Sequence, residues 1–240
     1  NADYRFWTGV AHWSMADFDA EREAYEAARE LDPDHYSATL YLAHNLLDSG
    51  RHADALTLYD RILRDDEYDP DALYNRAVIL EELGRTDQAR DAWLAYIRSY
   101  PDGSRARTAA DQLNALGDYS WRNFQVGKRR VTFKAIGFTP GTADLTGDAK
   151  ESLDLLAALL QSRPDLEVHV VAYNARGKAL AHEQAKAVRD YVSGMYTDVD
   201  PARLHLSWFG QGETVRTAEG ETTLGQSVAI FTKVESKQTQ

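Results

Sequence analysis

Apolar residues in the first half of the chain recur at helical spacing. A three-to-four residue spacing places them on one face of an amphipathic helix. One such stripe consists of Ala55, Leu58, Tyr59, Ile62 and Leu63. Stripes come in pairs, with Gly50 or Gly84 between the members of a pair. Glycine suits a tight turn between helices because it adopts a positive φ without strain, so the pattern predicts helix–turn–helix units.

These units recur at a fixed period along the chain. Gly50 and Gly84 are 34 positions apart, and so are Ala55 and Ala89. The pattern predicts three units, over residues 3–34, 36–69 and 71–101. One helix pair cannot bury its apolar face alone, so a fixed period of this length indicates helix pairs stacked into a solenoid.

The small, aromatic and proline positions of the units resemble the tetratricopeptide repeat (TPR). That family has a small residue at position 8, Gly at 15, Ala at 20, an aromatic residue at 24, Ala at 27 and Pro at 32. The matching residues are Gly9, Ala16, Glu21, Tyr25, Ala28 and Pro33 in the first unit, Ala43, Gly50, Ala55, Tyr59, Ile62 and Glu67 in the second, and Ala77, Gly84, Ala89, Trp93, Tyr96 and Pro101 in the third. Glu21 is the main departure. The resemblance implies a scaffold that binds a protein or peptide partner.

The TPR resemblance also places the first helix of each unit on the concave face of the solenoid. The candidate groove residues are His44, Leu47, Asp48, Tyr74, Val78, Glu81 and Glu82. The alternative is that they are ordinary surface and inter-helix positions. Three units make a short groove, which suits a peptide or a helix better than a large globular face. A further helix at about residues 104–116 is expected to cap the solenoid, so the repeat domain is predicted to span residues 3–118.

The second half of the chain alternates between strand and helix patterns. Residues 119–127 are rich in aromatic side chains and are expected to form a packed junction. Strands are predicted near residues 131–135, 166–173, 204–208 and 228–234, and helices at residues 145–160 and 179–195. The order β-α-β-α-β-β predicts helices packed on a mixed sheet. The expected fold class is therefore α followed by α/β, a helical solenoid and then an α/β sandwich.

Several strings in this half resemble the OmpA-like domain. They are Phe138-Thr139-Pro140-Gly141 before the first helix, Pro164-Asp165-Leu166 before the second strand, and Asp200-Pro201-Ala202-Arg203 before the third strand. The resemblance covers residues 128–235. It implies non-covalent binding to peptidoglycan and a periplasmic location associated with the outer membrane, often through a lipid anchor.

The residues with which that family binds peptidoglycan are only partly present. By resemblance, the pocket contains Tyr173, Asn174, Arg176, Lys178 and Gln184. The family's Asp, which engages the end of the stem peptide, is replaced by Ala175, and its Arg is replaced by Gln184. Charge-assisted, bidentate hydrogen bonds are strong contacts. Their loss predicts weak or absent binding to peptidoglycan, with Arg176 and Lys178 as candidates for a replacement cation.

Charge is divided unevenly between the two halves. Residues 1–118 contain 24 acidic residues, 12 arginines and no lysine, a net charge of −12, whereas the remainder carries +1. An acidic repeat domain argues against nucleic-acid binding, which needs a basic surface. Lys128, Arg129 and Arg130 form a small basic cluster. This cluster either faces an acidic partner or is the solvated start of a strand.

The sequence shows no pattern typical of catalysis or of a metal or cofactor site. There is no Cys, the seven His are scattered, and Walker and Gly-x-Ser-x-Gly motifs are absent. No stretch approaches the roughly 18 apolar residues of a membrane-spanning helix. We expect a non-enzymatic cell-envelope scaffold without a cofactor. Its repeats bind a protein partner, and its second domain associates with peptidoglycan or the outer-membrane region. The alternative is a pure interaction scaffold whose OmpA-like domain has lost peptidoglycan binding.

Overall fold

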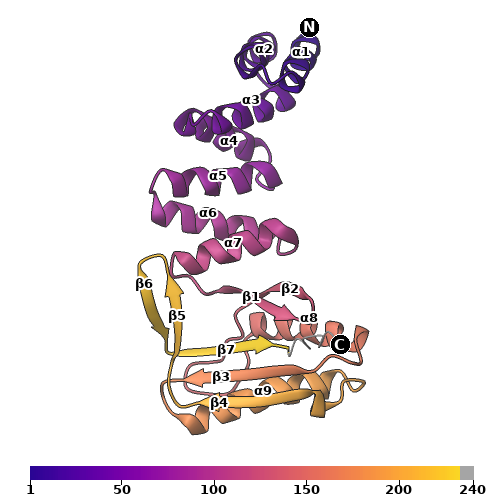
Figure 1. Ribbon diagram of the computed structural model, residues 1–240, viewed down its shortest axis with the longest axis vertical. Helices are drawn as coiled ribbons and strands as arrows, with labels where there is room; N and C mark the ends of the chain where they lie inside the picture. The colour runs from indigo at the N-terminus through magenta and orange to yellow at the C-terminus, as the bar shows by residue number, and fades with distance from the viewer. Residues whose placement is uncertain (233–240) are drawn as a thin grey trace, which may run out of the picture. The chain divides into compact units, whose positions relative to one another are not determined.

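The computed structural model describes residues 1–232, and the chain divides into two compact units between Tyr100 and Pro101. Residues 1–100 form three antiparallel helix pairs, drawn in indigo to magenta in Figure 1. The helices are α1 (Ala2–Ser14), α2 (Phe18–Leu31), α3 (Tyr36–Asp48), α4 (His52–Asp65), α5 (Pro70–Glu82) and α6 (Thr86–Ser99). The predicted helical repeats are confirmed.

The fixed period of the sequence corresponds to one repeated contact between the helices of a pair. In the first unit, Gly9 of α1 lies against Tyr25 of α2, and a Cβ built on Gly9 would come within 2.4 Å of the Tyr25 ring. The later units hold alanines at the small position, and these are fully buried. Ala55 and Ala89, which are 34 positions apart, are also fully buried.

The turns inside the units explain the regular spacing of the glycines along the chain. Gly50 and Gly84 have φ values of +74° and +68°, in the left-handed region that favours glycine. Ala16 occupies the same place in the first unit and also has a positive φ, of +57°. An L-residue with a Cβ is strained there. The first turn therefore has the same left-handed backbone as the two later turns, but an alanine in place of their glycine.

The departure at Glu21 is accommodated by a polar contact. Glu21 is buried, and Asn45 of α3 donates a hydrogen bond from Nδ2 to Glu21 Oε2 at 2.9 Å. The same amide group also donates to the Phe18 carbonyl. A buried carboxylate is tolerated when such partners are present. The first and second helix-pair repeats are therefore joined by hydrogen bonds where the TPR pattern has an apolar contact.

The second of the two compact units, hereafter the second unit, begins at Pro101 and is drawn from magenta to yellow in Figure 1. It begins with a helix and continues as a mixed α/β domain. Its elements are α7 (Gly103–Ala115), β1 (Trp121–Val126), β2 (Arg129–Lys134), α8 (Gly147–Ser162), β3 (Val168–Asn174), α9 (Lys178–Met195), a 3₁₀ turn (Pro201–Arg203), β4 (Leu204–Phe209), β5 (Glu213–Thr217), β6 (Gly220–Leu224) and β7 (Gln226–Phe231). The predicted α/β fold is confirmed, and within the described residues β1, β5 and β6 are strands that were not expected.

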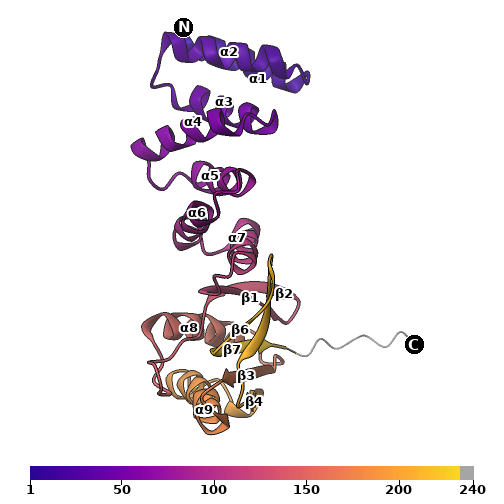
Figure 2. The ribbon, with the colours of Figure 1, turned by 90° about the vertical axis from the view of Figure 1, so that its left-hand side faces the viewer.

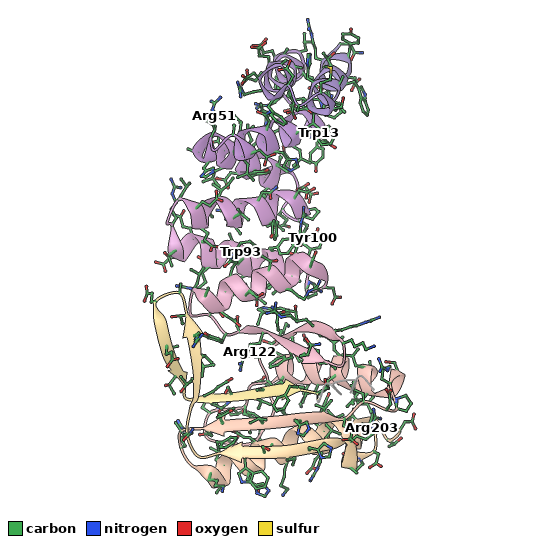
Figure 3. All side chains as sticks on the ribbon, viewed as in Figure 1. Trp13, Arg51, Trp93, Tyr100, Arg122 and Arg203 are labelled. Atoms are coloured by element: carbon green, nitrogen blue, oxygen red, sulfur yellow. The ribbon has the colours of Figure 1, made fainter. Side chains whose placement is uncertain are left out.

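The central sheet has the strand order β4-β3-β7. β3 pairs with β4 in parallel and with β7 in antiparallel register. Helices α8 and α9 lie on one side of this sheet (Figure 2). Between the helices and the sheet, Leu153, Leu156, Val170, Val188 and Ile230 form part of one apolar core. Arg203 (Figure 3) donates to the carbonyls of Leu160 and Leu166 and so satisfies the end of α8.

The expected junction at residues 119–127 is largely a strand. β1 forms an antiparallel hairpin with β2, and the two-residue turn contains Gly127 at a φ of +62°. Glycine at positive φ is typical of such tight hairpins. The Thr232 amide donates to the Gln125 carbonyl at 3.2 Å, which links the hairpin to the chain after β7.

Two further differences concern the ends of the second unit. Helix α7, expected at residues 104–116 as a cap for the repeats, falls in the second unit and packs on β1, β2 and β5. Its capping role stays a prediction. The final strand was expected at residues 228–234, and β7 ends at Phe231. Residues 233–235, the end of the predicted OmpA-like domain, lie outside the described residues.

Candidate functional site

The pocket predicted by resemblance to OmpA-like domains contains a chain of amide groups. Asn174 at the end of β3 donates from Nδ2 to Gln184 Oε1 of α9 at 3.0 Å. Gln184 in turn donates from Nε2 to the Thr142 carbonyl at 2.9 Å and to Gln226 Oε1 at 3.3 Å. Asn174 and Gln184 are buried. Three neutral side chains thus connect β3, α9, the start of β7 and the loop before α8, and they use each other's hydrogen-bonding groups.

The two cations near this amide chain lie at its rim. Arg176 is exposed, and its guanidinium lies over Gly141, where an added Cβ would come within 2.7 Å of Nη1. Gly141 has a φ of +81°. Lys178 is exposed at the first position of α9. Neither cation enters the buried amide chain.

Tyr173 does not join the amide chain. Successive residues of a strand point to opposite faces, and Asn174 faces the helices. Tyr173 accordingly stacks on Phe209 of β4, with ring centroids 5.2 Å apart. The same open face holds His169 and His205, whose rings stack at 4.9 Å. Of the five predicted pocket residues, the fold therefore brings Asn174 and Gln184 into contact and separates Tyr173 from them.

In the repeats, two of the predicted groove residues support the neighbouring helix. Tyr74 of α5 packs edge-on against Trp93 and Tyr96 of α6, with centroids 5.2 Å apart in both cases. Glu81 accepts a hydrogen bond from Trp93 Nε1 at 3.0 Å. Both side chains are half-buried. They are inter-helix contacts, and Glu81 also brings a negative charge to the surface of α5.

The remaining candidates differ in exposure. His44 is half-buried between the rings of Tyr41 and Tyr59. Asp48 and Glu82 are exposed, and Glu82 lies 3.0 Å from the ring nitrogen of His52. Leu47 and Val78 are half-buried. The seven residues therefore combine aromatic packing with three carboxylates, and their role as a groove stays a prediction.

The electrostatics of this region are dominated by tyrosines near carboxylates. Burial raises the pKa of Tyr59 well above its usual value, and the nearby charge of Asp48 adds to the effect. Burial and a hydrogen bond to Asp69 likewise raise the pKa of Tyr36. Asp69 is itself buried, and it accepts a hydrogen bond from the Ala72 amide at the start of α5. The acidic run at residues 65–69 thus forms the turn between two units.

Thr142 and Gln226 were missed by sequence reasoning. Thr142 contributes only its backbone carbonyl, for which no side-chain pattern exists. Gln226 is the first residue of β7, far along the chain from Asn174 and Gln184, so no local spacing linked it to them. Within residues 1–232, no helix combines the length and hydropathy of a membrane span, and no group of three or more His, Asp or Glu is arranged to hold a metal ion.

Comparison with solved structures finds several TPR proteins that resemble the chain. It is 17% identical to MamA AMB-1 over 50% of this chain and 67% of that chain, with a TM-score of 0.44. It is 18% identical to the Arabidopsis OM64 TPR domain (47% and 93% covered, TM-score 0.44). It is 14% identical to the first TPR of Spaghetti (RPAP3), solved bound to the HSP90 peptide SRMEEVD (48% and 90% covered, TM-score 0.44). No curated protein is significantly similar to the chain in sequence.

Comparison with protein families covers both units. Residues 2–35 and 40–104 match the tetratricopeptide repeat. Residues 137–225 match the OmpA family. The chain therefore belongs to the proteins that carry tetratricopeptide repeats, here over residues 2–104, followed by an OmpA family domain, here over residues 137–225.

Proposed function

We propose that this chain is a non-enzymatic interaction scaffold of the cell envelope, placed in the periplasm near the outer membrane. Its repeats bind a protein or peptide partner, and its OmpA domain binds peptidoglycan weakly or not at all. The family matches support an interaction scaffold. The amide chain of Asn174, Gln184 and Gln226 carries the second part of the proposal.

The chemical argument concerns the stem peptide of peptidoglycan, whose end bears both a positive and a negative charge. A pocket for such an end needs an anion and a cation of its own. In this chain the aligned positions hold Ala175, which is exposed and apolar, and Gln184, which is buried and already hydrogen-bonded on both sides. Each lost charge-assisted hydrogen bond costs about 1.5–3 kcal/mol. Two such losses weaken binding by roughly a hundredfold or more.

Co-sedimentation of the full chain with purified sacculi tests this part. The parent protein is expected to stay in the supernatant, and the double variant Ala175→Asp/Gln184→Arg is expected to pellet. Lys150→Asp, on the exposed face of α8, serves as a control for a nonspecific change of charge. Strong pelleting of the parent would contradict the proposal. If Arg176→Ala abolished that pelleting, the chain would instead be a wall adaptor that uses Arg176 as its cation.

The partner of the repeats is expected to present basic or aromatic side chains. Asp48 and Glu82 are exposed and Glu81 is half-buried, so the predicted groove is negative. Charge complementarity of this kind weakens with rising salt. Partners captured from an envelope extract should therefore elute at higher salt from the parent than from a Glu81→Gln variant. Glutamine keeps an acceptor for the Trp93 indole, so the variant removes charge without removing that hydrogen bond.

Glu67→Gln provides the matched control, because Glu67 is an exposed acid in the turn between the second and third units. Removal of its charge should leave elution unchanged. Partners whose elution responds neither to salt nor to Glu81→Gln would show that the seven groove candidates are not the binding surface.

A further inference from the structure

A groove in the second unit lies away from the amide chain, beside the β1–β2 hairpin. It has a volume of about 680 Å³ and is lined by residues 101–103 and 107, 128–132, and 155, 158 and 159. All of them belong to the unit that begins at Pro101. The walls are α7 and α8, which both pack on β2 and lie above and below the hairpin in Figure 2. Strand β2 lines the groove between them.

The charge of this groove is strongly positive. Arg107, Lys128, Arg129 and Arg130 line it, against one acidic residue, Asp102. Arg130 is neutralised by a two-pronged ion pair with Asp111 of α7, at 2.9 and 2.5 Å. The side chains of Arg107, Lys128 and Arg129 make no ion pair or hydrogen bond within residues 1–232. Three cations without a partner in the described part of the chain therefore line the groove of a protein whose net charge is −11.

The side toward α8 is apolar. Leu155 is 56% exposed, and Leu159 is half-buried next to it. Large aliphatic side chains on the outer face of a helix are normal when scattered singly. Here Leu155, Ala158 and Leu159 all line the same groove as the cations. The groove is thus basic toward α7 and the hairpin turn, and apolar toward α8.

The third feature of the groove, after its cations and its apolar wall, is the backbone of β2. The Ala135 amide donates to the Ser120 carbonyl at 2.7 Å, so these two residues form a hydrogen-bonded pair of the hairpin. Bonded and non-bonded pairs alternate along an antiparallel ladder. In the register of β1 and β2, Arg130 and Thr132 consequently turn their N–H and C=O groups away from β1. Within residues 1–232, β2 pairs with no strand on that side.

This free edge is confined to the groove. Lys134 is the next residue of β2 whose backbone groups turn away from β1. Its carbonyl accepts a hydrogen bond from Ser152 Oγ of α8 at 3.0 Å, so the edge is closed there. Arg130 and Thr132 both line the groove. An unpaired edge next to an apolar wall is a template for another strand.

We propose that this groove binds an extended acidic peptide of another protein, which adds to the free edge of β2 as a third strand. Side chains of an added strand alternate as those of β2 do. On β2, Arg130 faces α7 and Val131 packs toward the core under α8. A peptide with alternating acidic and apolar residues therefore places its carboxylates on the α7 side, near Arg107, and its apolar side chains on Leu155 and Leu159. Arg129 shares the face of Val131 and lies at the end of the groove, beside the hairpin turn.

The test uses fluorescence anisotropy of a labelled decapeptide of alternating Glu and Val, titrated with the full chain. Binding is expected to weaken by about tenfold or more for Arg107→Glu, since reversal of a cation that has no partner within residues 1–232 replaces attraction by repulsion. Lys150→Glu, on the exposed face of α8 outside the groove, should change the affinity less than twofold. A peptide of alternating Lys and Val should not bind. Equal binding of both peptides would overturn the proposal.

Strand addition is tested separately from charge. Two further peptides carry N-methyl groups on either the odd or the even backbone amides, and both keep their carboxylates. The one whose methylated amides face β2 cannot complete the ladder and should bind at least about tenfold more weakly. On the protein, Arg130→Pro removes the outward N–H, whereas Arg130→Ala removes only the guanidinium. Both variants remove the ion pair with Asp111, so the difference between them reports the N–H, and binding should be at least about tenfold weaker in the first variant than in the second. A melting curve like that of the parent confirms that each variant is folded.

Two outcomes would assign the groove to another ligand. If both N-methylated peptides bound as well as the unmethylated one, the contact would be electrostatic and β2 would not be its template. If vesicles of mixed phosphatidylglycerol and phosphatidylcholine bound the parent but not Arg107→Glu, while the Glu–Val peptide did not bind, the groove would be a lipid site. Both results contradict the proposal without depending on the partner of the repeats or on peptidoglycan.

Discussion

Arg122 of β1 and Glu213 of β5 form a two-pronged ion pair although they are 91 residues apart in the chain. The distances are 2.7 Å from Nη1 to Oε2 and 2.8 Å from Nη2 to Oε1, and the two side chains are only 15% and 14% exposed. Arg122 is labelled in Figure 3. The Ala218 amide, between β5 and β6, also donates to the Ala115 carbonyl at the end of α7, at 2.8 Å. The β5–β6 hairpin therefore binds both β1 and α7, and this ties the start of the second unit to its end.

The first prediction concerns this pair in acid. Burial by itself would raise the pKa of Glu213, but the hydrogen bonds from Arg122 outweigh it and hold the pKa below its usual value. The folded state therefore binds this proton more weakly than the unfolded state, and the pair stabilises the fold above about pH 4.5. That contribution is lost as the pH falls through the pKa of the folded state. Calorimetric unfolding should show a smaller loss of stability from pH 6 to pH 3 for Glu213→Gln than for the parent.

At pH 7 the same substitution should lower the free energy of unfolding by about 1.5–3 kcal/mol, the value of a hydrogen bond to a charged group. Arg122→Ala should flatten the acid dependence at least as much, since burial without Arg122 raises the pKa of Glu213. An acid dependence unchanged in both variants would contradict the assigned role of the pair.

The second prediction concerns Gly9→Ala. The new Cβ would lie 2.4 Å from Cε1 of Tyr25, a ring that is fully buried. Overpacking of this kind costs about 1–3 kcal/mol, measured as a lower free energy of unfolding in urea. Gly194→Ala is the matched control, because Gly194 lies in α9 with open space around its Cβ position. That variant should be as stable as the parent or more stable.

The third prediction concerns Ala16→Gly, which should stabilise the protein. Ala16 has a φ of +57° in the turn where the later units have Gly50 and Gly84. Removal of its Cβ relieves left-handed strain, and the expected gain is about 0.5–1 kcal/mol. The reciprocal change, Gly50→Ala, should destabilise by a similar amount, since its Cβ meets no atom within 4 Å and only the backbone is strained. Thermal melts that move in the same direction for both variants would refute this account.

The fourth prediction concerns alkaline pH. Burial and a hydrogen bond to Asp154 raise the pKa of Tyr191 to about 12. The folded state holds this proton more tightly than the unfolded state, so the contribution is complete below about pH 10 and is lost as the pH rises toward 12. Tyr191→Phe should reduce the loss of stability between pH 9 and pH 12. Tyr4→Phe, at an exposed position of α1, should leave that loss unchanged. Urea unfolding of the parent and both variants at each pH measures the effect.

The repeat architecture was predictable because each structural constraint recurs in the sequence. Close helix contacts exclude large side chains, and positive φ values favour glycine, so both leave a regular period at positions such as Gly50 and Ala55. The hairpin β5–β6 was not predicted, because most of its side chains are exposed and only Val215 is buried. A strand with no buried face has no alternation to detect. β1 was missed because its burial pattern is irregular.

The candidate sites were predictable only in part. Resemblance pointed to Asn174 and Gln184, and the structure joins them. Their further partners come from the loop before α8 and from the start of β7, and such contacts depend on how the chain closes on itself. The basic cluster at residues 128–130 was recognised, but the choice between a solvated strand and a binding surface depended on α8. That helix supplies the apolar wall from a later part of the chain.

The amide chain has a consequence for how this end of the domain responds to its surroundings. Asn174, Gln184 and Gln226 carry no ionisable group, yet they hold together the ends of two strands, a helix and a loop. A carboxylate–guanidinium pair in the same place would change its charge in acid and would weaken in concentrated salt. The neutral connection does neither. This corner of the fold should therefore keep one geometry across wide changes of acidity and ionic strength.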